Sequence, residues 1–230
     1  MNVDFSVLFR GDYLALISKG LGTMFQLTLC AWLLAMVLGT FLAIVRMTPS
    51  RPAQLAVAVW VEYHQNVPML VQIFLWYFGI AALLPQGLQF WANKNGGELI
   101  FSIIAVGLAM SAYISEDLRG GIRSIPKSQL EAARALGLSY WQAFTRVVLP
   151  QAVRIALPTL INHSVLLFKN TSLAMAIGVV ELTYVTREIE SQTFKTVEIY
   201  LFATAVYLGI SLLLMAAGSL LERRMAITGR

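Results

Sequence analysis

Few side chains in this sequence are of the kind that performs covalent or metal chemistry. His163-Ser164 and Glu62-x-His64 contain residue types used by hydrolases and metal sites, but no complete triad or convincing ligand cluster accompanies them. The nucleotide-binding pattern G-x-x-x-x-G-K-[ST] does not occur, so the chain cannot supply an ATPase of that kind. The lone Cys30 can form no disulfide within the chain. We therefore expect no catalytic residue, no metal and no cofactor bound by this chain.

Polar side chains within one apolar run are better candidates for contact with a small molecule. His163, Asn170, Thr171 and Ser172 interrupt the run at 155–180, and polar groups inside a membrane span are costly and usually functional. His163 and Asn170 are seven residues apart, on roughly one face of a helix. An unwound stretch around Asn170 would expose backbone groups to a substrate.

Structural roles compete with that interpretation. His163 could instead hydrogen-bond a neighbouring carbonyl, and Lys169 could extend to an interface or pair with a carboxylate. Glu62 is a further candidate for the substrate pathway, and its alternative is a boundary residue that caps a helix or pairs with a base.

Membrane-spanning helices must position these residues, because the composition excludes a soluble protein. Of the 230 residues 58% are hydrophobic and 13% are charged, and mean hydropathy is +0.71, whereas soluble domains carry about 25% charged residues. A bilayer crossing needs about 20 apolar residues. We predict an all-α integral membrane protein, one domain over residues 1–230, whose five transmembrane helices lie at about 20–45, 65–84, 99–115, 155–180 and 199–221.

Small residues mark two helix faces where close packing is expected. They recur at Ala31, Ala35, Gly39 and Ala43 in the first span, and in the third span at Gly107, Ser111 and Ser115.

The distribution of basic residues predicts the orientation. With the N-terminus outside, eleven Lys and Arg lie on the inner side and five on the outer side, and Lys169 lies within a span, which accounts for all 17. This satisfies the positive-inside tendency, so we expect a periplasmic N-terminus and a cytoplasmic C-terminus. The net charge of +5 is then an orientation signal. No arginine-rich cluster or aromatic stacking surface indicates nucleic acid.

The inner segment from Glu116 to Arg154 is too long for a simple connection, and its centre, about 124–152, is organised. Ser128 with Glu131, and Ser139 with Gln142, have capping-box spacing, which favours two helix starts. Gly137 is placed to end the first helix in a left-handed conformation. Pro150 and Pro158 bracket the entry into the fourth span. We expect two short helices joined by a glycine hinge at the cytoplasmic face.

This segment resembles the EAA loop of ABC importer permeases. The resemblance consists of Glu131-Ala132-Ala133, Gly137 and Val147-Val148-Leu149-Pro150, with Val147 where the family usually has Ile. Two further segments are similar to signatures of the polar amino-acid permeases. Glu62 to Gln72 (EYHQNVPMLVQ) has Gln65 in place of the usual Arg, and Phe168 to Leu173 (FKNTSL) has Asn170 in place of the frequent Asp.

The resemblance implies a five-helix permease subunit of the inner membrane that is not itself an enzyme. Its partners would be two ATPase subunits that bind ATP and Mg, a periplasmic amino-acid-binding protein, and a second permease, either an identical copy or a paralogue. Coupling to the ATPase would fall to Glu131, Ala132, Ala133, Gly137, Leu149 and Pro150. The same resemblance places Asn170, with Thr171 and Ser172, near the substrate.

The substrate expected is an acidic amino acid. Between the boundaries of the third, fourth and fifth spans there is no carboxylate to receive a basic side chain, and the fourth span contains Lys169 and His163. The Asn-Val-Pro and Lys-Asn pairings resemble the glutamate/aspartate branch. Neutral polar or basic amino acids, such as glutamine, histidine or arginine, remain alternatives. A secondary transporter is a more distant one, because no internal repeat is visible and the inner segment would have no role.

Overall fold

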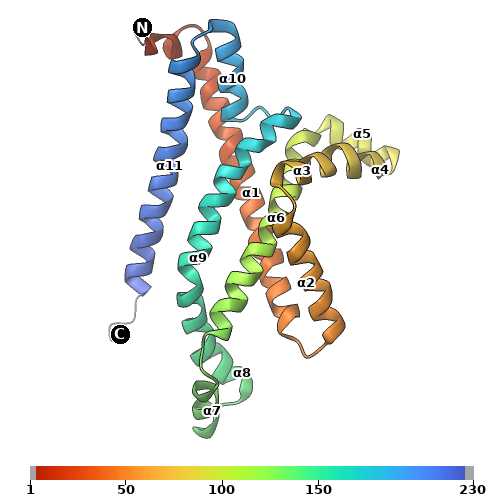
Figure 1. Ribbon diagram of the computed structural model, residues 1–230, viewed down its shortest axis with the longest axis vertical. Coiled ribbons are helices and arrows are strands. Elements are labelled where there is room, and N and C mark those ends of the chain that lie inside the picture. Colours follow the sequence, from red (N-terminus) through yellow and green to blue (C-terminus); the bar gives the residue numbers. More distant parts are fainter. Residues whose placement is uncertain (1–3, 226–230) are drawn as a thin grey trace.

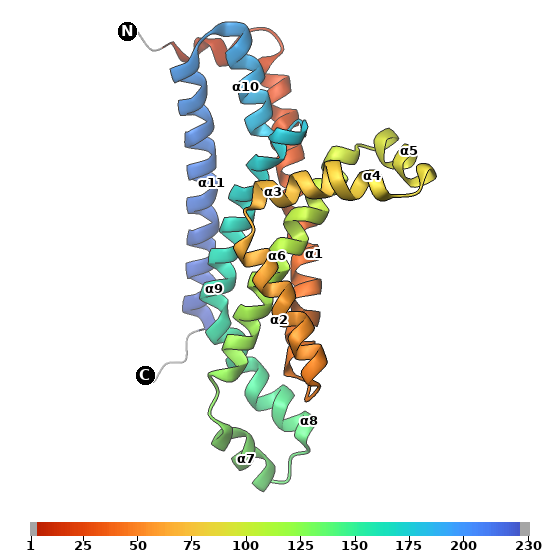
Figure 2. The same ribbon diagram turned by 45° about the vertical axis from the view of Figure 1, so that its right-hand side comes forward.

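The computed structural model describes residues 4–225, and all the regular secondary structure in that range is helical. Long helices form an elongated bundle with a lateral arm and a short helical hairpin at one end (Figures 1 and 2). The elements are η1 (Phe5–Phe9), α1 (Tyr13–Met47), α2 (Arg51–Asn66), α3 (Met69–Phe74), η2 (Leu75–Ile80), α4 (Ala81–Leu83), α5 (Gln86–Lys94), α6 (Gly97–Arg123), α7 (Lys127–Ala135), α8 (Tyr140–Ala143), η3 (Phe144–Val148), α9 (Leu149–Asn170), η4 (Thr171–Ile177), α10 (Leu182–Thr193) and α11 (Thr196–Met225).

Four helical stretches are long and apolar enough to cross a membrane. They cover Tyr13–Met47, Gly97–Arg123, Tyr140–Ile177 and Thr196–Met225, and a bent pair, Arg51–Asn66 with Met69–Leu83, brings the number of possible spans to five. Successive long elements alternate in direction, so the α1–α2 turn, the α7–α8 hairpin and the last turn of α11 lie toward one end of the bundle (Figure 1). That is the end where the sequence concentrates its arginines.

Most of the segment expected to be one span at 65–84 is the second arm of a bent helix pair that begins at Arg51. α2 ends at Asn66, and the chain turns by 109° before continuing as α3 into the lateral arm (Figure 2). Pro68 has no backbone N–H to continue the α2 ladder. The buried Gln72 side chain stabilises the break, because its Nε2 donates to the carbonyls of His64 (3.1 Å) and Val67 (2.8 Å).

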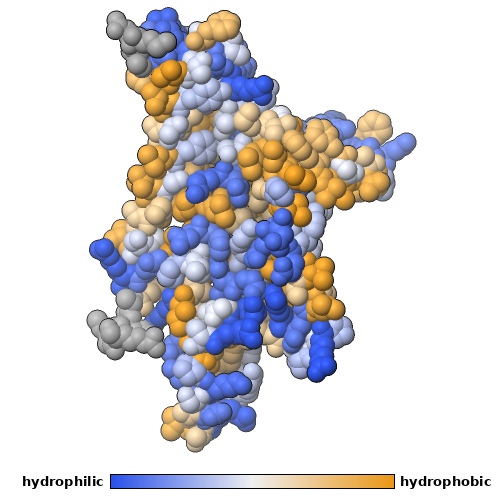
Figure 3. Space-filling model, in the orientation of Figure 1, coloured by the Kyte–Doolittle hydropathy of each residue, from blue (hydrophilic) through white to orange (hydrophobic). Residues whose placement is uncertain are grey.

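The arm carries much of the exposed apolar surface. In Figure 3 hydrophobic side chains cover much of α3–α5, whereas hydrophilic ones gather over the lower half of the bundle. The rising part of this bent pair, α2, has only 16 residues, about 24 Å of helix, against a hydrocarbon core of about 30 Å. α2 alone is therefore too short to cross the bilayer, and only α2 together with Met69–Leu83 qualifies as a span.

The two small-residue stripes pack as the sequence predicts. All four small residues of the α1 stripe are buried. A Cβ at Gly39 would lie 2.9 Å from the backbone oxygen of Ser111 and 2.8 Å from Ile114, and one at Gly107 would lie 2.6 Å from Leu34. α1 and α6 thus approach so closely that only glycine fits at these points.

The remaining long helices run beyond the expected spans. α6 continues to Arg123, so Glu116 and Asp117 are helical residues and the loop begins after them. α9 contains Pro158 within its helix, and α11 is a continuous helix to Met225. These two carboxylates therefore lie on a bundle helix, where Glu116 pairs with Arg46 and Arg119 and Asp117 pairs with His163.

Candidate functional site: a terminal helical hairpin and an interhelical cavity

The first helix of the hairpin begins two residues earlier than its sequence pattern suggests. α7 starts at Lys127 with Pro126 at the N-cap position and no side-chain cap. Ser128 therefore lies inside the first turn, and the predicted Ser128–Glu131 capping box does not form. The reason is that Pro126 already has the extended backbone conformation of an N-cap (ψ 135°) and its fixed φ leads directly into the helix.

Gly137 ends this helix in the predicted left-handed conformation, with φ of +88°. Its N–H donates to the Arg134 carbonyl at 3.0 Å, and the Leu138 N–H donates to the Ala133 carbonyl at 3.3 Å. These two bonds are those of a Schellman motif. They set the angle at which the chain turns back toward the bundle.

The second predicted capping box is present. The Gln142 N–H donates to the Ser139 hydroxyl, and the Gln142 side chain accepts from the Ser139 N–H at 3.0 Å. α8 then passes through the π-helical turn η3 directly into α9, where Leu149 and Pro150 form the first turn. The hairpin is therefore joined to α9 by continuous helix.

The hairpin lies at one end of the molecule (Figure 2), and most of its side chains are exposed. Ala133 is buried against the hairpin interior, whereas Glu131 and Ala132 are exposed. Sequence reasoning missed the largest exposed apolar groups, Leu136, Tyr140 and Trp141, which are 85%, 60% and 70% exposed. Large apolar residues inside an otherwise polar segment were the available signal, because monomeric soluble surfaces rarely gather such groups without a partner.

His163 is paired with a carboxylate, which the sequence analysis did not place near it. Its Nδ1 lies 2.6 Å from Asp117 Oδ2, and its ring lies against Tyr113 with centroids 5.0 Å apart. Two expectations differ from the structure. One is a backbone carbonyl as the alternative partner of His163, and the other is the absence of a carboxylate from the third, fourth and fifth spans. They differ because α6 is longer than its predicted span and turns Asp117 toward α9.

The chain around Asn170 is tightened and does not unwind. α9 ends at Asn170, and η4, a 3-10 helix, follows without interruption until Gly178 at φ +91°. The hydroxyls of the buried Thr171 and of Ser172 donate to the carbonyls three residues before them, at 2.7 and 2.8 Å. The expected unwound stretch with free backbone groups is therefore absent at 170–172.

Two of the polar residues around the end of α9 line a common cavity. A space of about 570 Å³ lies between α9, α10 and α11, and Lys169 and Ser172 form part of its wall. Its other lining residues are Val165, Thr183, Tyr200, Ala203, Thr204, Tyr207, Leu208, Ser211, Leu212 and Met215. Among the described residues Lys169 is the only charged side chain in this wall.

The other predicted substrate residues lie apart from this cavity. His163, Asn170 and Thr171 are not in its wall. Glu62 is an exposed residue of α2 whose carboxylate accepts a hydrogen bond from Asn66 at 3.1 Å. Of the predicted substrate residues, only Ser172 therefore lines this cavity, and Lys169 lines it as well.

Behind the cavity wall lies a buried carboxylate that sequence reasoning did not single out. Glu181 is fully buried at the N-cap of α10 and accepts from the N–H groups of Thr183 and Tyr184 and from the Tyr207 hydroxyl, each at 2.9 Å. Burial raises the pKa of the Glu181 carboxyl, and these hydrogen bonds oppose the rise. The signal was an acidic residue at the end of an apolar run, directly before a helix.

Neither cluster of this site has the composition of a metal centre. Within residues 4–225 no group of three or more His, Cys, Asp or Glu side chains is placed to hold a metal ion. The arrangement offers a hydroxyl-rich pocket with one ammonium group, and an exposed hairpin connected to it by α9.

Comparisons with known proteins agree on one class. Residues 35–227 match the family described as "Binding-protein-dependent transport system inner membrane component". The glutamate/aspartate import permease protein GltJ of Escherichia coli K12 is 32% identical over 221 residues, 94% of this chain and 90% of GltJ. The probable glutamine ABC transporter permease protein GlnM of Bacillus subtilis is 34% identical over 82% of this chain and 83% of its own.

A solved structure extends the similarity to the whole fold. A chain in the crystal structure of an amino acid ABC transporter with histidines superposes with a TM-score of 0.84 at 30% identity, covering 97% of this chain and 100% of that chain.

Proposed function

This chain belongs to the family of binding-protein-dependent transport system inner membrane components, as the permease of an amino-acid ABC importer, and we propose that its cargo is an acidic amino acid, glutamate or aspartate. It is an inner-membrane protein with several apolar helices. In the proposed cycle the amino acid passes from the periplasm to the cytoplasm as the helices alternate between two packings.

The observation that carries the substrate proposal is the charge of the α9–α11 cavity. Lys169 contributes an ammonium group, and Ser172, Thr183, Tyr207 and Ser211 contribute hydroxyls. A second carboxylate on the substrate gains from that cation, because hydrogen bonds to charged groups are about twice as strong as neutral ones. Glu181 is fully buried and does not line the cavity, so it presents no carboxylate directly to the substrate.

Glutamine import is the second candidate, and one observation favours it. The Asp117 carboxylate on α6 lies beside His163 on α9, so the helices around the pathway are less uniformly basic than the sequence suggests. The similarity to GlnM points in the same direction. An amide side chain would meet the same hydroxyls with no need for the ammonium group. Histidine and arginine uptake are weaker candidates, because Lys169 repels a cationic side chain.

Energy for transport comes, in this proposal, from a separate ATPase. The α7–α8 hairpin would seat in a groove on one ATPase subunit, with Glu131 and Ala132 at the contact and Ala133 and Gly137 holding the hairpin's shape. Its exposed Leu136, Tyr140 and Trp141 suit burial in such a groove, because aromatic side chains are enriched at protein interfaces. ATP and Mg would be bound by the ATPase, and this chain would bind no cofactor.

The assembly proposed has two such ATPases, a second permease and a periplasmic binding protein. Whether the second permease is an identical copy or a paralogue can be read from the intact mass of the purified complex. A secondary transporter needs none of these partners. Uptake that runs on a pH gradient without the ATPase would overturn the importer proposal.

Uptake by the reconstituted complex tests the cargo. Proteoliposomes that hold the complex and ATP are given its binding protein with labelled glutamate, aspartate, glutamine or arginine in turn. We expect ATP-dependent uptake of glutamate and aspartate, competed by each other. Uptake of glutamine alone would favour the second candidate, and uptake of arginine alone would contradict the proposal.

A further inference from the structure

A cavity lined by four arginines lies between the end of α1, the first turns of α2 and the end of α6, which are the lower ends of these helices in Figure 1. It has a volume of about 620 Å³ and contains Arg46, Arg51, Arg119 and Arg123. The rest of its wall is formed by Met47, Gln54, Leu55 and Ala58. None of its lining residues belongs to the α7–α8 hairpin or to the α9–α11 cavity.

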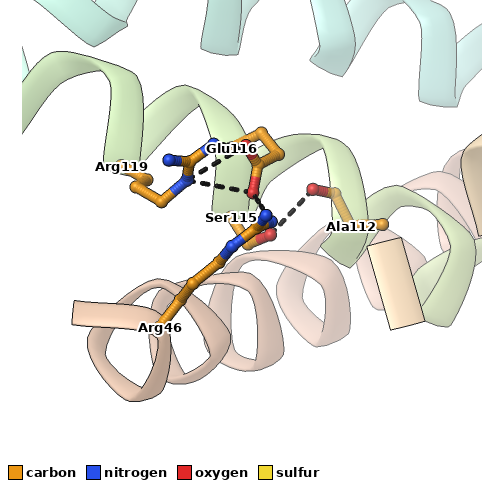
Figure 4. Close-up of polar contacts among 5 residues, drawn as sticks. All are labelled: Arg46, Ala112, Ser115, Glu116 and Arg119. Atoms are coloured by element: carbon orange, nitrogen blue, oxygen red, sulfur yellow. Dashed lines mark hydrogen bonds and ion pairs between the residues drawn. The ribbon is translucent and has the colours of Figure 1, made fainter. Parts of the chain in front are cut away.

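Positive charge is in excess around it. Arg46 and Arg119 both pair with the carboxylate of Glu116, and Arg119 Nε lies 3.0 and 3.1 Å from its two oxygens (Figure 4). Arg51 and Arg123 make no ion pair with any residue between 4 and 225. One carboxylate among four guanidinium groups leaves a surplus of three positive charges.

The Glu116 pairs also fix the geometry of the cluster. They tie the last turn of α1 to α6, so two guanidinium groups are held in place and the exposed Arg51 and Arg123 remain at the rim. Gathered like charges repel each other, and a bound anion relieves that repulsion. The planar guanidinium fork matches the oxygens of a phosphate in particular.

The apolar side chains in the wall of the arginine cavity indicate what kind of molecule bears the phosphate. Met47 and Leu55 are 43% and 66% exposed and belong to elements that, in the proposed orientation, meet the cytoplasmic surface of the membrane. A free phosphate has no use for apolar contacts, whereas the glycerol and first acyl carbons of a phospholipid do. The cytoplasmic leaflet is rich in anionic lipids, and basic pockets between membrane helices on that side bind their headgroups.

We propose that this arginine cavity binds the phosphate of an anionic phospholipid at the cytoplasmic surface. The bound phosphate bridges the rim arginines Arg51 and Arg123 and joins the α1–α2 turn to the end of α6. Arg123 and Met47 also line the cavity of about 320 Å³ that separates α6 from the α7–α8 hairpin. The lipid therefore steadies the base from which the hairpin projects.

The test compares lipid retention in two matched double variants of the full transporter complex. Arg51→Gln/Arg123→Gln removes the rim arginines, and Arg223→Gln/Arg224→Gln removes two exposed arginines at the same end of the bundle, on α11. Native mass spectrometry follows binding of short-chain phosphatidylglycerol and, separately, of short-chain phosphatidylcholine. We expect phosphatidylglycerol binding about 10-fold weaker in the rim variant and little changed in the α11 variant.

Three results of the lipid-binding measurements would overturn the proposal, and a competition experiment supplies a fourth. The three are unchanged phosphatidylglycerol binding in the rim variant, an equal loss in the α11 variant, or equal binding of phosphatidylcholine by the wild type. Displacement of the lipid by millimolar inorganic phosphate would assign the cavity to a soluble phosphate and contradict the lipid. Arg51→Lys/Arg123→Lys retains the charge but not the fork, so partial recovery of binding is expected from it, and this guards against a folding defect in the Gln variant.

Discussion

At the residue scale, Lys169 is the side chain whose charge separates the candidate cargoes. It is exposed to the α9–α11 cavity from one helical turn below Ser172, and its own backbone carbonyl accepts the Ser172 hydroxyl. The ammonium group therefore stands beside hydroxyls that any amino acid can use. Only an acidic side chain brings a second carboxylate, beyond the α-carboxylate common to all amino acids, that can pair with the cation.

Replacing Lys169 by Gln should raise the KM for glutamate more than the KM for any neutral amino acid. Loss of one charge-assisted hydrogen bond predicts an increase of about 10-fold, with kcat nearly unchanged because ATP hydrolysis drives the cycle elsewhere. Concentration-dependent uptake into proteoliposomes measures both constants. Lys94→Gln on α5 is the control with the same charge change, and equal effects of the two variants would show that Lys169 has no special part.

Glu181 predicts a pH dependence of stability. Burial raises the pKa of its carboxyl above the ordinary 4.5, so the folded protein holds this proton more tightly than the unfolded chain does. The stabilising contribution is complete below pH 4.5 and is lost as the pH rises through the folded-state pKa. Glu181→Gln carries no titrating proton and should remove this component.

Apparent melting temperatures of the detergent-solubilised protein, measured from pH 4.5 upward, check this expectation. The wild type should lose stability with rising pH more steeply than Glu181→Gln. Glu188→Gln, on the same helix α10, is the control and should follow the wild type. Parallel curves for wild type and Glu181→Gln would rule out a contribution from this carboxyl.

At the element scale, the α7–α8 hairpin depends on Gly137. Its φ of +88° is a conformation that side chains with a Cβ rarely adopt, although open space surrounds it. Proline cannot reach that φ and would also remove the N–H that donates to Arg134. The hairpin would lose its angle while the bundle helices remain packed.

Gly137→Pro should therefore leave membrane insertion and complex size intact and reduce ATP-driven uptake to about the background level. Asparagine tolerates the left-handed region better than other residues, so Gly137→Asn should retain a substantial part of the activity. Size-exclusion chromatography, ATPase assays and uptake assays together separate loss of assembly from loss of coupling. Full uptake by the proline variant would mean that the hairpin does not transmit force.

At the scale of the whole molecule, the alternating helices place the hairpin and the turn between α10 and α11 at opposite ends (Figure 2). The proposed orientation assigns the hairpin to the cytoplasm and the other end to the periplasm. Cys30 is the only native cysteine, so replacing it by alanine gives a background in which one introduced thiol can be followed.

In that background, Gln192→Cys should react with a membrane-impermeant maleimide in intact spheroplasts, and Gln142→Cys only after the membrane is opened. Both positions are exposed, so access across the bilayer decides the result. Labelling of Gln142→Cys in intact spheroplasts would show that the topology is the reverse of the one proposed. It would also remove the cytoplasmic setting on which the lipid proposal rests.

The sequence by itself determined the features that depend on local order. Apolar runs predicted the long helices α1, α6 and α11, because length and hydropathy belong to a single segment. The left-handed Gly137 and the Ser139–Gln142 capping box followed from residues at most four positions apart. The small-residue stripe at Ala31, Ala35, Gly39 and Ala43 predicted a face for close helix packing, and the structure identified α6 as its partner.

Only the tertiary structure decided which distant side chains meet. The pair Asp117–His163 spans 46 residues, Arg46–Glu116 spans 70 and Glu181–Tyr207 spans 26. Each depends on the rotation and offset of two packed helices, which the pattern of either helix leaves undetermined. The turn after Asn66 likewise required Gln72 to reach back to two carbonyls. The sequence determines where helices form. Only their packing creates the cavity between α9 and α11 and gathers four arginines where α1, α2 and α6 meet.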